Sequence, residues 1–244
     1  MEDSVEIIVH IPACQIKHWE YVLPLKGSQE AIDFGASPLV AQEPFLNSPI
    51  PMLIAEQHIE TPSKLLELNN IKQLEVLGNS VLETIENNKN KLNYSILSGR
   101  LIHADGTSIM ITGYESSGDN VVFATWDYGE PVDYVLARLS EAKRIIKLPI
   151  EVVRVILART VLPDLPCPQV VLSNVSAIGE MRPLTCIGGY GDNKTGNTPP
   201  IAIAVGTKTI NIVVDHRVYN PPTMLLFVRE FISRLKKGLD SIAV

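Results

Sequence analysis

The chain has 244 residues, 45% of them hydrophobic, and a formal net charge of −6 from 21 Lys and Arg against 27 Asp and Glu. This length and composition suffice for one well-packed core, so we expect a single domain over residues 1–244. The acidic balance offers no basic stripe with interleaved aromatic residues, which excludes nucleic acid as the expected partner.

The N-terminal segment lacks the features of a targeting signal. It reads MEDSVEIIVHIPA and is acidic where a signal peptide is basic, and no apolar run in the chain approaches the roughly 18 to 20 residues that span a bilayer. The three cysteines, Cys14, Cys167 and Cys186, are scattered and odd in number, which suits a reducing compartment better than a disulfide framework. We therefore expect a cytoplasmic protein with no membrane partner.

The first third of the chain predicts a strand, a loop and a long helix. β-Branched residues predict a strand over residues 5–11, after which six prolines make the segment up to about Pro51 mostly loop. Thr61 suits a helix cap and Pro62 the first helical position. Apolar residues at helical spacing then predict one continuous helix as far as Ile85.

The remainder of the chain alternates irregularly between strands and helices. Residues 94–114 predict a hairpin that turns at residues 103–106. The elements expected after it are strand 121–126, helix 131–147, helix 150–161, strand 170–173, the paired strands 201–205 and 209–215, and a final helix opened by Asn220, Pro221 and Pro222. This succession predicts an α/β fold with a mixed β-sheet.

His216 is the candidate for acid–base chemistry. It lies between Asp215 and Arg217, where an apolar strand meets the turn before a capped helix. A neutral imidazole at this place could take a proton from a thiol or hydroxyl and return it to a leaving group. The alternative is a histidine that only hydrogen-bonds at a strand–helix corner, and one histidine alone favours that alternative.

A metal site is the weaker candidate. His10, Cys14 and His18 recur every fourth residue, which on one helix would align a thiol and two imidazoles for zinc. Pro12 and the β-branched residues before it disfavour such a helix, so we expect no metal and no tightly bound cofactor.

Three segments of the second half carry a family resemblance. They read PQVVLSNVSAIG (168–179), NTPPIAIAVG (197–206) and DHRVYN (215–220), the last followed by a helix that ends FVREFISRLKKGL. In this order they resemble the catalytic domain of the acyltransferases of 2-oxo-acid dehydrogenase complexes, which is related in fold to chloramphenicol acetyltransferase. The resemblance implies a two-layer sandwich with a mixed β-sheet that assembles as a homotrimer. It covers residues 130–244 well and the first half poorly.

The resemblance also implies an activity. The chain would move an acyl group from a thioester donor, acyl-CoA or a carrier-bound acyl group, to a small acceptor, with coenzyme A thioester as a substrate. His216 aligns with the general base of the family and Ser173 with its oxyanion-binding hydroxyl, and the two would meet across a subunit interface. Asp215, Arg217 and Asn220 would support them.

Two departures from the family pattern keep other interpretations open. Asn220 stands where the family has Asp, and Pro221 replaces its Gly, which restricts the backbone after the turn. The alternatives are a catalytically silent trimeric binding or scaffold protein of the same fold, and an enzyme that uses the same pocket for another reaction such as cyclisation. The basic pair Lys143 and Arg144 and the three basic residues within 234–237 are expected to lie on solvated helix faces, with contact to the phosphates of coenzyme A as the alternative.

Overall fold

The computed structural model of the chain describes residues 7–10, 54–97, 100–114, 121–145, 147, 168–176, 199–215 and 218–242. The strands in these ranges are β1 (Ile7–His10), β2 (Ile54–Glu60), β3 (Tyr94–Leu97), β4 (Arg100–His103), β5 (Ser108–Tyr114), β6 (Val121–Asp127), β7 (Val170–Asn174), β8 (Ile201–Val205) and β9 (Thr209–Asp215). The helices are α4 (Ser63–Glu67), α5 (Asn70–Asn87), α6 (Lys89–Leu92), α7 (Val132–Ile145) and α9 (Pro221–Ser241).

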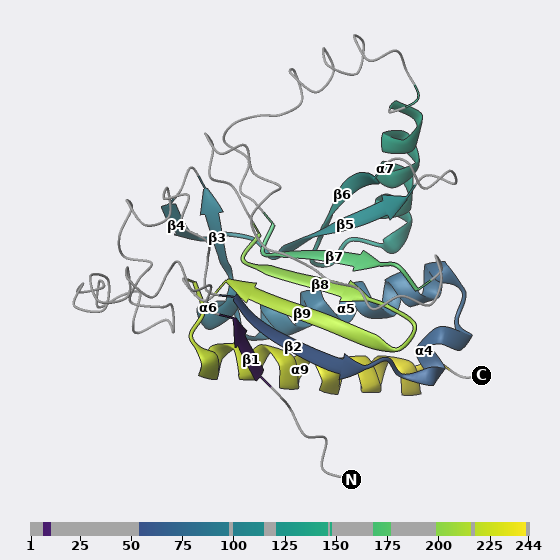
Figure 1. Cartoon of the computed structure of the whole chain (residues 1–244). Coiled ribbons are helices and arrows are strands. Elements are labelled where there is room, and N and C mark those ends of the chain that lie inside the picture. Colours follow the sequence, from purple (N-terminus) through teal and green to yellow (C-terminus); the bar gives the residue numbers. More distant parts are fainter. Residues whose placement is uncertain are drawn as a thin grey trace, which may run out of the picture.

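Seven of these strands form one mixed sheet in the order β1-β2-β9-β8-β7-β5-β6. The pairs β5–β7 and β7–β8 are parallel, and the other neighbours are antiparallel. Strands β3 and β4 form a separate antiparallel pair. Figure 1 shows the long helices α5 and α9 side by side along one face of the large sheet, which makes the described part a two-layer α/β structure.

The main core lies between the sheet and the helices. Alternate residues of the strands, such as Ile203 and Ile212, are buried against apolar residues of α5 and α9, such as Leu77 and Phe227. This is the pattern expected where successive side chains of a strand point to opposite faces. Helix α7 extends the same core over β6, where Val135 is fully buried.

The long helix expected after Thr61 is divided in two. Helix α4 ends at Glu67 and α5 begins at Asn70, because the side chain of Asn69 accepts a hydrogen bond from the Lys72 amide at 3.0 Å and so caps a new helix. The expectation that Thr61 caps the first helix was wrong. Its hydroxyl instead donates to the carbonyl of Gly206 at 2.9 Å, in the hairpin between β8 and β9.

The expected hairpin over residues 94–114 was also wrong. Strand β4 turns back onto β3, whereas β5 leaves them and joins the large sheet between β6 and β7. Strand β2, IAEQHIE, was not expected from the sequence, because its polar and apolar residues do not alternate. It nevertheless pairs with β9 over its whole length, and this pairing joins β1 and β2 to the rest of the sheet.

The other described elements agree with the sequence. Strands β1, β6, β7, β8 and β9 and helices α7 and α9 lie within a few residues of their expected bounds. The expected loop up to Pro51 and helix over 150–161 lie outside the described residues. Within the described part of the chain, no helix is both long and apolar enough to cross a membrane.

Candidate active site

Ser173 lies near the end of β7, on the face of the sheet that points away from α5 and α9. Its neighbours in the strand, Leu172 and Asn174, point to the helix side, because Leu172 belongs to the main core and Asn174 bonds to a side chain of α5. By the alternation of a strand, Ser173 points to the opposite side. The residue is half-buried there, so its hydroxyl is positioned by a rigid strand and is not enclosed in the core.

A polar network fixes the end of this strand to helix α5. The Asn174 amide donates to Gln73 Oε1 at 2.9 Å, and Gln73 in turn donates to the carbonyl of Leu68 at 2.9 Å. The hydroxyl of Ser176 lies 2.7 Å from Asn174 Oδ1 and 3.1 Å from Gln73 Oε1. Because Gln73 is buried and its polar atoms are engaged, this network holds the backbone next to Ser173 in one position.

Asp215 ends β9 and begins the turn that contains His216 and Arg217. It is fully buried, and its amide donates to the carbonyl of Pro200 at 2.8 Å. Its own carbonyl accepts two hydrogen bonds, from the amides of Val218 at 3.0 Å and Tyr219 at 3.1 Å. The backbone is thus fixed on both sides of residues 216 and 217, which themselves lie outside the described residues.

Asn220 and Pro221 start helix α9. The Asn220 side chain accepts a hydrogen bond from the Thr223 amide at 3.0 Å, and Pro221 takes the first helical position, where no amide hydrogen is needed. The two departures from the family pattern are therefore explained locally: they form a standard helix start directly after the turn.

Ser173 and Asp215 are far apart in one chain. Ser173 pairs with Ala204, and Ala204 pairs with Asn211, which precedes Asp215 by four residues along β9. Four residues along a strand and two spacings between neighbouring strands put the Cα atoms of Ser173 and Asp215 roughly 16 Å apart. One chain therefore does not bring Ser173 close to the residue that follows Asp215.

The surface between these two ends is built from small and apolar residues. Val171, Ala202 and Val213 form a buried cluster on this face, with Met110 packed against it. Asn211, next to Ala204, is the polar member of this surface and is fully buried. Asn211 was not among the site residues expected from the sequence, although an asparagine within the apolar strand INIVVD is an unusual choice for a strand interior.

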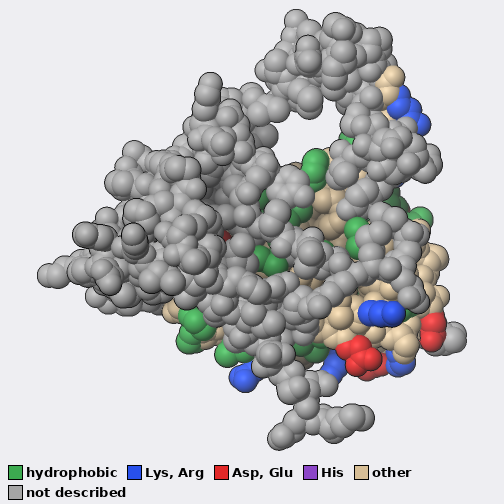
Figure 2. Space-filling model, in the orientation of Figure 1, with side chains coloured by type: hydrophobic (Ala, Val, Ile, Leu, Met, Phe, Trp, Pro, Cys, Tyr) green, Lys and Arg blue, Asp and Glu red, His purple; other side chains and the backbone are tan. Residues whose placement is uncertain are grey.

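The remaining candidates are placed as follows. Arg144 forms an ion pair with Glu141 at 2.6 Å, and Arg234 one with Glu83 at 2.9 Å, so both guanidinium groups already have acidic neighbours on helix surfaces. Figure 2 shows the charged side chains of the described residues mainly near the lower edge of the side of the molecule that it draws. Cys14 and His18 lie outside the described residues, within which no group of three His, Cys, Asp or Glu could hold a metal ion.

Gln73, Asn174 and Ser176 are further residues that the sequence analysis missed. The only sequence signal for them is the short polar run SNVS after the apolar strand, which is typical of an Asx turn. Nothing in the sequence indicates that Gln73, about one hundred residues earlier, is the partner of this turn.

Comparison with known proteins shows which structures have a similar fold. No family model matches the chain, and a search of curated proteins found no match. A probable dihydrolipoamide acetyltransferase from Listeria monocytogenes 4b F2365 has a similar structure, with a TM-score of 0.54 and 12% identity over 91% of this chain and 96% of that one. The cubic core of the pyruvate dehydrogenase multienzyme complex has a TM-score of 0.50 and 15% identity, over 81% of this chain and 84% of that one. Chloramphenicol acetyltransferase has a TM-score of 0.47 and 16% identity, over 79% of this chain and 92% of that one.

The described chain thus has the fold of acyltransferase catalytic cores. The expected fold class, an α/β two-layer sandwich with a mixed β-sheet, is confirmed by the strand order and by the similarity to the probable dihydrolipoamide acetyltransferase structure. At identities of 12% to 16% the likeness concerns the fold, and the chemistry has to be argued from the residues of this chain.

Proposed function

We propose that the protein is an acyltransferase that moves an acyl group from a thioester, acyl-CoA or a carrier-bound acyl group, to a small acceptor. The observation that carries this proposal is the placement of Ser173 on an acyltransferase fold: it lies on a fixed strand end, half-buried, on the face away from the helices. Dihydrolipoamide acetyltransferase, which has a similar structure, is by its name a transferase of this class.

His216 is the proposed general base. Its neutral imidazole removes the proton from the thiol, hydroxyl or amine of the acceptor as the acceptor attacks the thioester carbonyl. The tetrahedral intermediate then collapses, the carbon–sulfur bond breaks, and the imidazolium returns the proton to the leaving thiolate. Asp215 and Asn220 support this step by fixing the backbone before and after residues 216 and 217. Arg217, the next residue in the sequence after His216, is proposed to support it as well.

Ser173 is the proposed oxyanion donor. The negative charge on the carbonyl oxygen develops only in the transition state, so a hydroxyl that is already held in place stabilises the transition state more than the bound substrate. One such preorganised donor contributes roughly 3 to 4 kcal/mol. The network of Gln73, Asn174 and Ser176 keeps the strand end of Ser173 fixed and so supplies this preorganisation.

The complete site is proposed to form between two copies of the chain. In one chain the distance between the strand ends of Ser173 and Asp215 is roughly 16 Å, which is too long for both residues to act on one carbonyl group. A neighbouring subunit can bring its own Ser173 to the His216 turn. A homotrimer repeats this contact three times around its axis and leaves no site incomplete.

The test is thiol release from acetyl-CoA, malonyl-CoA, longer acyl-CoA and acyl-pantetheine, followed with a thiol reagent and a panel of small acceptors. We expect turnover by the wild type, its loss in His216→Ala, and a fall of about 10²- to 10³-fold in kcat for Ser173→Ala. Ser140→Ala, an exposed serine of α7, is the matched control and should leave kcat unchanged. Turnover unaffected by both site substitutions would refute the assignment of these residues.

A catalytically silent trimer of the same fold is the second candidate. The observation that favours it is Pro221, which begins α9 where the resembled family has Gly and so restricts the backbone directly after the turn. A trimer in light scattering, combined with no thiol release from any of these donors, would favour this candidate over the transferase.

A further inference from the structure

Tyr219 connects the turn of His216 to a distant part of the chain. Its hydroxyl donates to the carbonyl of Leu92, the last residue of α6, at 2.7 Å. A backbone hydrogen bond from Tyr94 reaches the same hydroxyl, and the ring of Tyr94 lies edge-on to the Tyr219 ring at a centroid distance of 6.5 Å. The side chain is 1% exposed, and this burial raises the pKa of its phenol well above the ordinary value. Tyr219 therefore stays a neutral hydrogen-bond donor.

The backbone of Tyr219 is part of the turn itself. Its amide and that of Val218 both donate to the carbonyl of Asp215. One residue thus closes the turn through its backbone and ties it to α6 through its side chain. Aliphatic side chains at position 219 could fill the same space but could not make the hydrogen bond to Leu92.

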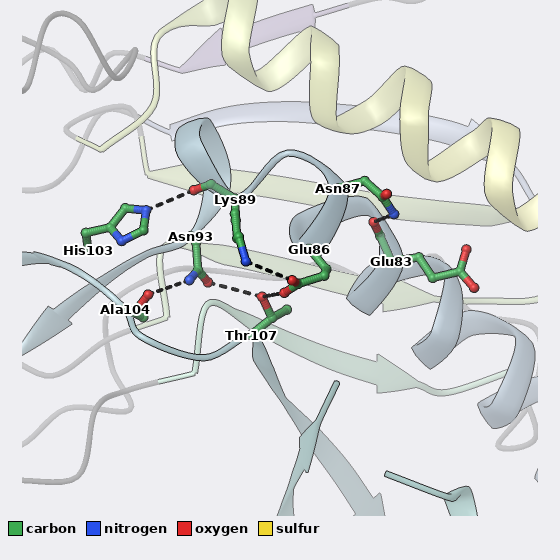
Figure 3. Close-up of polar contacts among 8 residues, drawn as sticks. All are labelled: Glu83, Glu86, Asn87, Lys89, Asn93, His103, Ala104 and Thr107. Atoms are coloured by element: carbon green, nitrogen blue, oxygen red, sulfur yellow. Dashed lines mark hydrogen bonds and ion pairs between the residues drawn. The ribbon is translucent and has the colours of Figure 1, made fainter. Parts of the chain in front are cut away.

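The junction that receives Tyr219 is itself rigid. Figure 3 shows the contacts between α5, α6 and the segments before β3 and β5. The side chain of Asn93 donates to the Ala104 carbonyl at 2.6 Å, and the Ala104 amide donates to the Asn93 carbonyl at 2.8 Å. The Thr107 hydroxyl donates to Glu86 at 2.8 Å, and Lys89 pairs with the same carboxylate at 3.1 Å. Leu92 therefore presents its carbonyl from a fixed backbone.

We infer that Tyr219 is a positioning residue: by bonding the α6–β3 junction, it sets the conformation of the turn that carries His216. The role of His216 as base rests on the proposed function. The hydrogen bond from Tyr219 to Leu92 makes the geometry of the turn depend on a residue 127 positions earlier, which the proposed function does not include.

The test compares wild type, Tyr219→Phe and Tyr134→Phe. Tyr134 is 61% exposed on α7, so Tyr134→Phe removes a hydroxyl of the same kind away from the turn. In Tyr219→Phe we expect amide hydrogen exchange at residues 218 and 219 to become about tenfold faster, because the lost bond allows the turn to open locally. The imidazole nitrogen resonances of His216 should shift as well. The control should match the wild type in both measurements.

Turnover supplies a separate readout. If the proposed function holds, Tyr219→Phe should lower kcat about tenfold and leave KM for the donor nearly unchanged. Lower thermal stability with none of these changes would reduce Tyr219 to a structural residue and overturn the inference. Wild-type protein without turnover, but with the expected exchange and resonance changes in Tyr219→Phe, would refute the proposed function and support the inference.

A second variant covers the case in which Tyr219→Phe does not fold. Thr107→Val keeps the side-chain volume and removes the bond to Glu86, which loosens the junction without touching the turn. Exchange at residues 218 and 219 should rise about two- to threefold in this variant. Unchanged exchange at both positions would overturn the inference.

Discussion

The indole ring of Trp126 occupies the space that Gly78 leaves open on helix α5. A Cβ atom at position 78 would come within 2.6 Å of Cε3 of the ring, closer than real Cβ contacts allow. The ring is fully buried and its Nε1 donates to the Glu130 carbonyl at 2.9 Å, so it cannot simply move aside. This contact joins β6 to α5 and closes the core at that end of the sheet.

The first prediction concerns this contact. Gly78→Ala should lower the free energy of unfolding by about 1 to 3 kcal/mol, because the cost of overpacking exceeds the gain of roughly 1 kcal/mol in helix propensity. Urea denaturation measures the change. Gly106→Ala is the matched control, since no atom lies within 4 Å of its added Cβ, and it should change stability by less than about 0.5 kcal/mol. An equal effect of both substitutions would contradict the prediction.

The second prediction concerns the start of α9. Asn220→Ala removes the side chain that accepts from the Thr223 amide and should lower the free energy of unfolding by about 1 kcal/mol. Asn220→Asp retains an acceptor at the same place and should stay close to the wild type. Denaturation curves of the three proteins measure these differences. The same loss of stability in both variants would show that the missing cap does not cause it.

The third prediction concerns acid stability. The Thr107 hydroxyl, and next the Lys89 ammonium, hold the pKa of the Glu86 carboxyl below its ordinary value of 4.5. A carboxyl whose pKa is lower in the folded than in the unfolded protein stabilises the fold above the unfolded pKa, and this contribution is lost as the pH falls through the folded pKa.

Glu86→Gln should therefore lose stability relative to the wild type above about pH 4.5 and approach it at lower pH. Thermal unfolding between pH 3 and pH 7 measures this difference. Thr107→Val should reduce the same pH dependence, because it removes the main cause of the lowered pKa. A difference between Glu86→Gln and wild type that does not vary with pH would contradict the assignment.

The fourth prediction concerns the interface. If each site takes His216 from one subunit and Ser173 from its neighbour, mixing His216→Ala and Ser173→Ala subunits should restore activity to about one quarter of the wild type, because random exchange leaves that share of sites intact. The mixture is unfolded and refolded together, and thiol release is measured. Each variant refolded alone is the control. A mixture no more active than its components would place both residues in one chain or outside the site.

Local sequence determined much of this fold. Helix α9 has its cap, its prolines and its apolar spacing within one segment, and β8 and β9 are apolar strands joined by three residues. Such elements depend on interactions between residues that are close in the chain, so their bounds followed from the sequence. The same holds for the segments that carry Ser173 and His216, which were identified by their order and resemblance.

Other features depend on partners far away in the chain and were decided only by the tertiary structure. Polar and apolar residues do not alternate in β2, which is a strand because its backbone pairs with that of β9. Strand β5 pairs with β6 and β7, whereas the sequence predicted that it would pair within residues 94–114. At the candidate site, the sequence determined which residues could do chemistry. The tertiary structure decided that Ser173 and Asp215 stand at distant strand ends, and that Tyr219 is tied to Leu92, because strand register and buried hydrogen bonds are set between segments whose spacing carries no local signal.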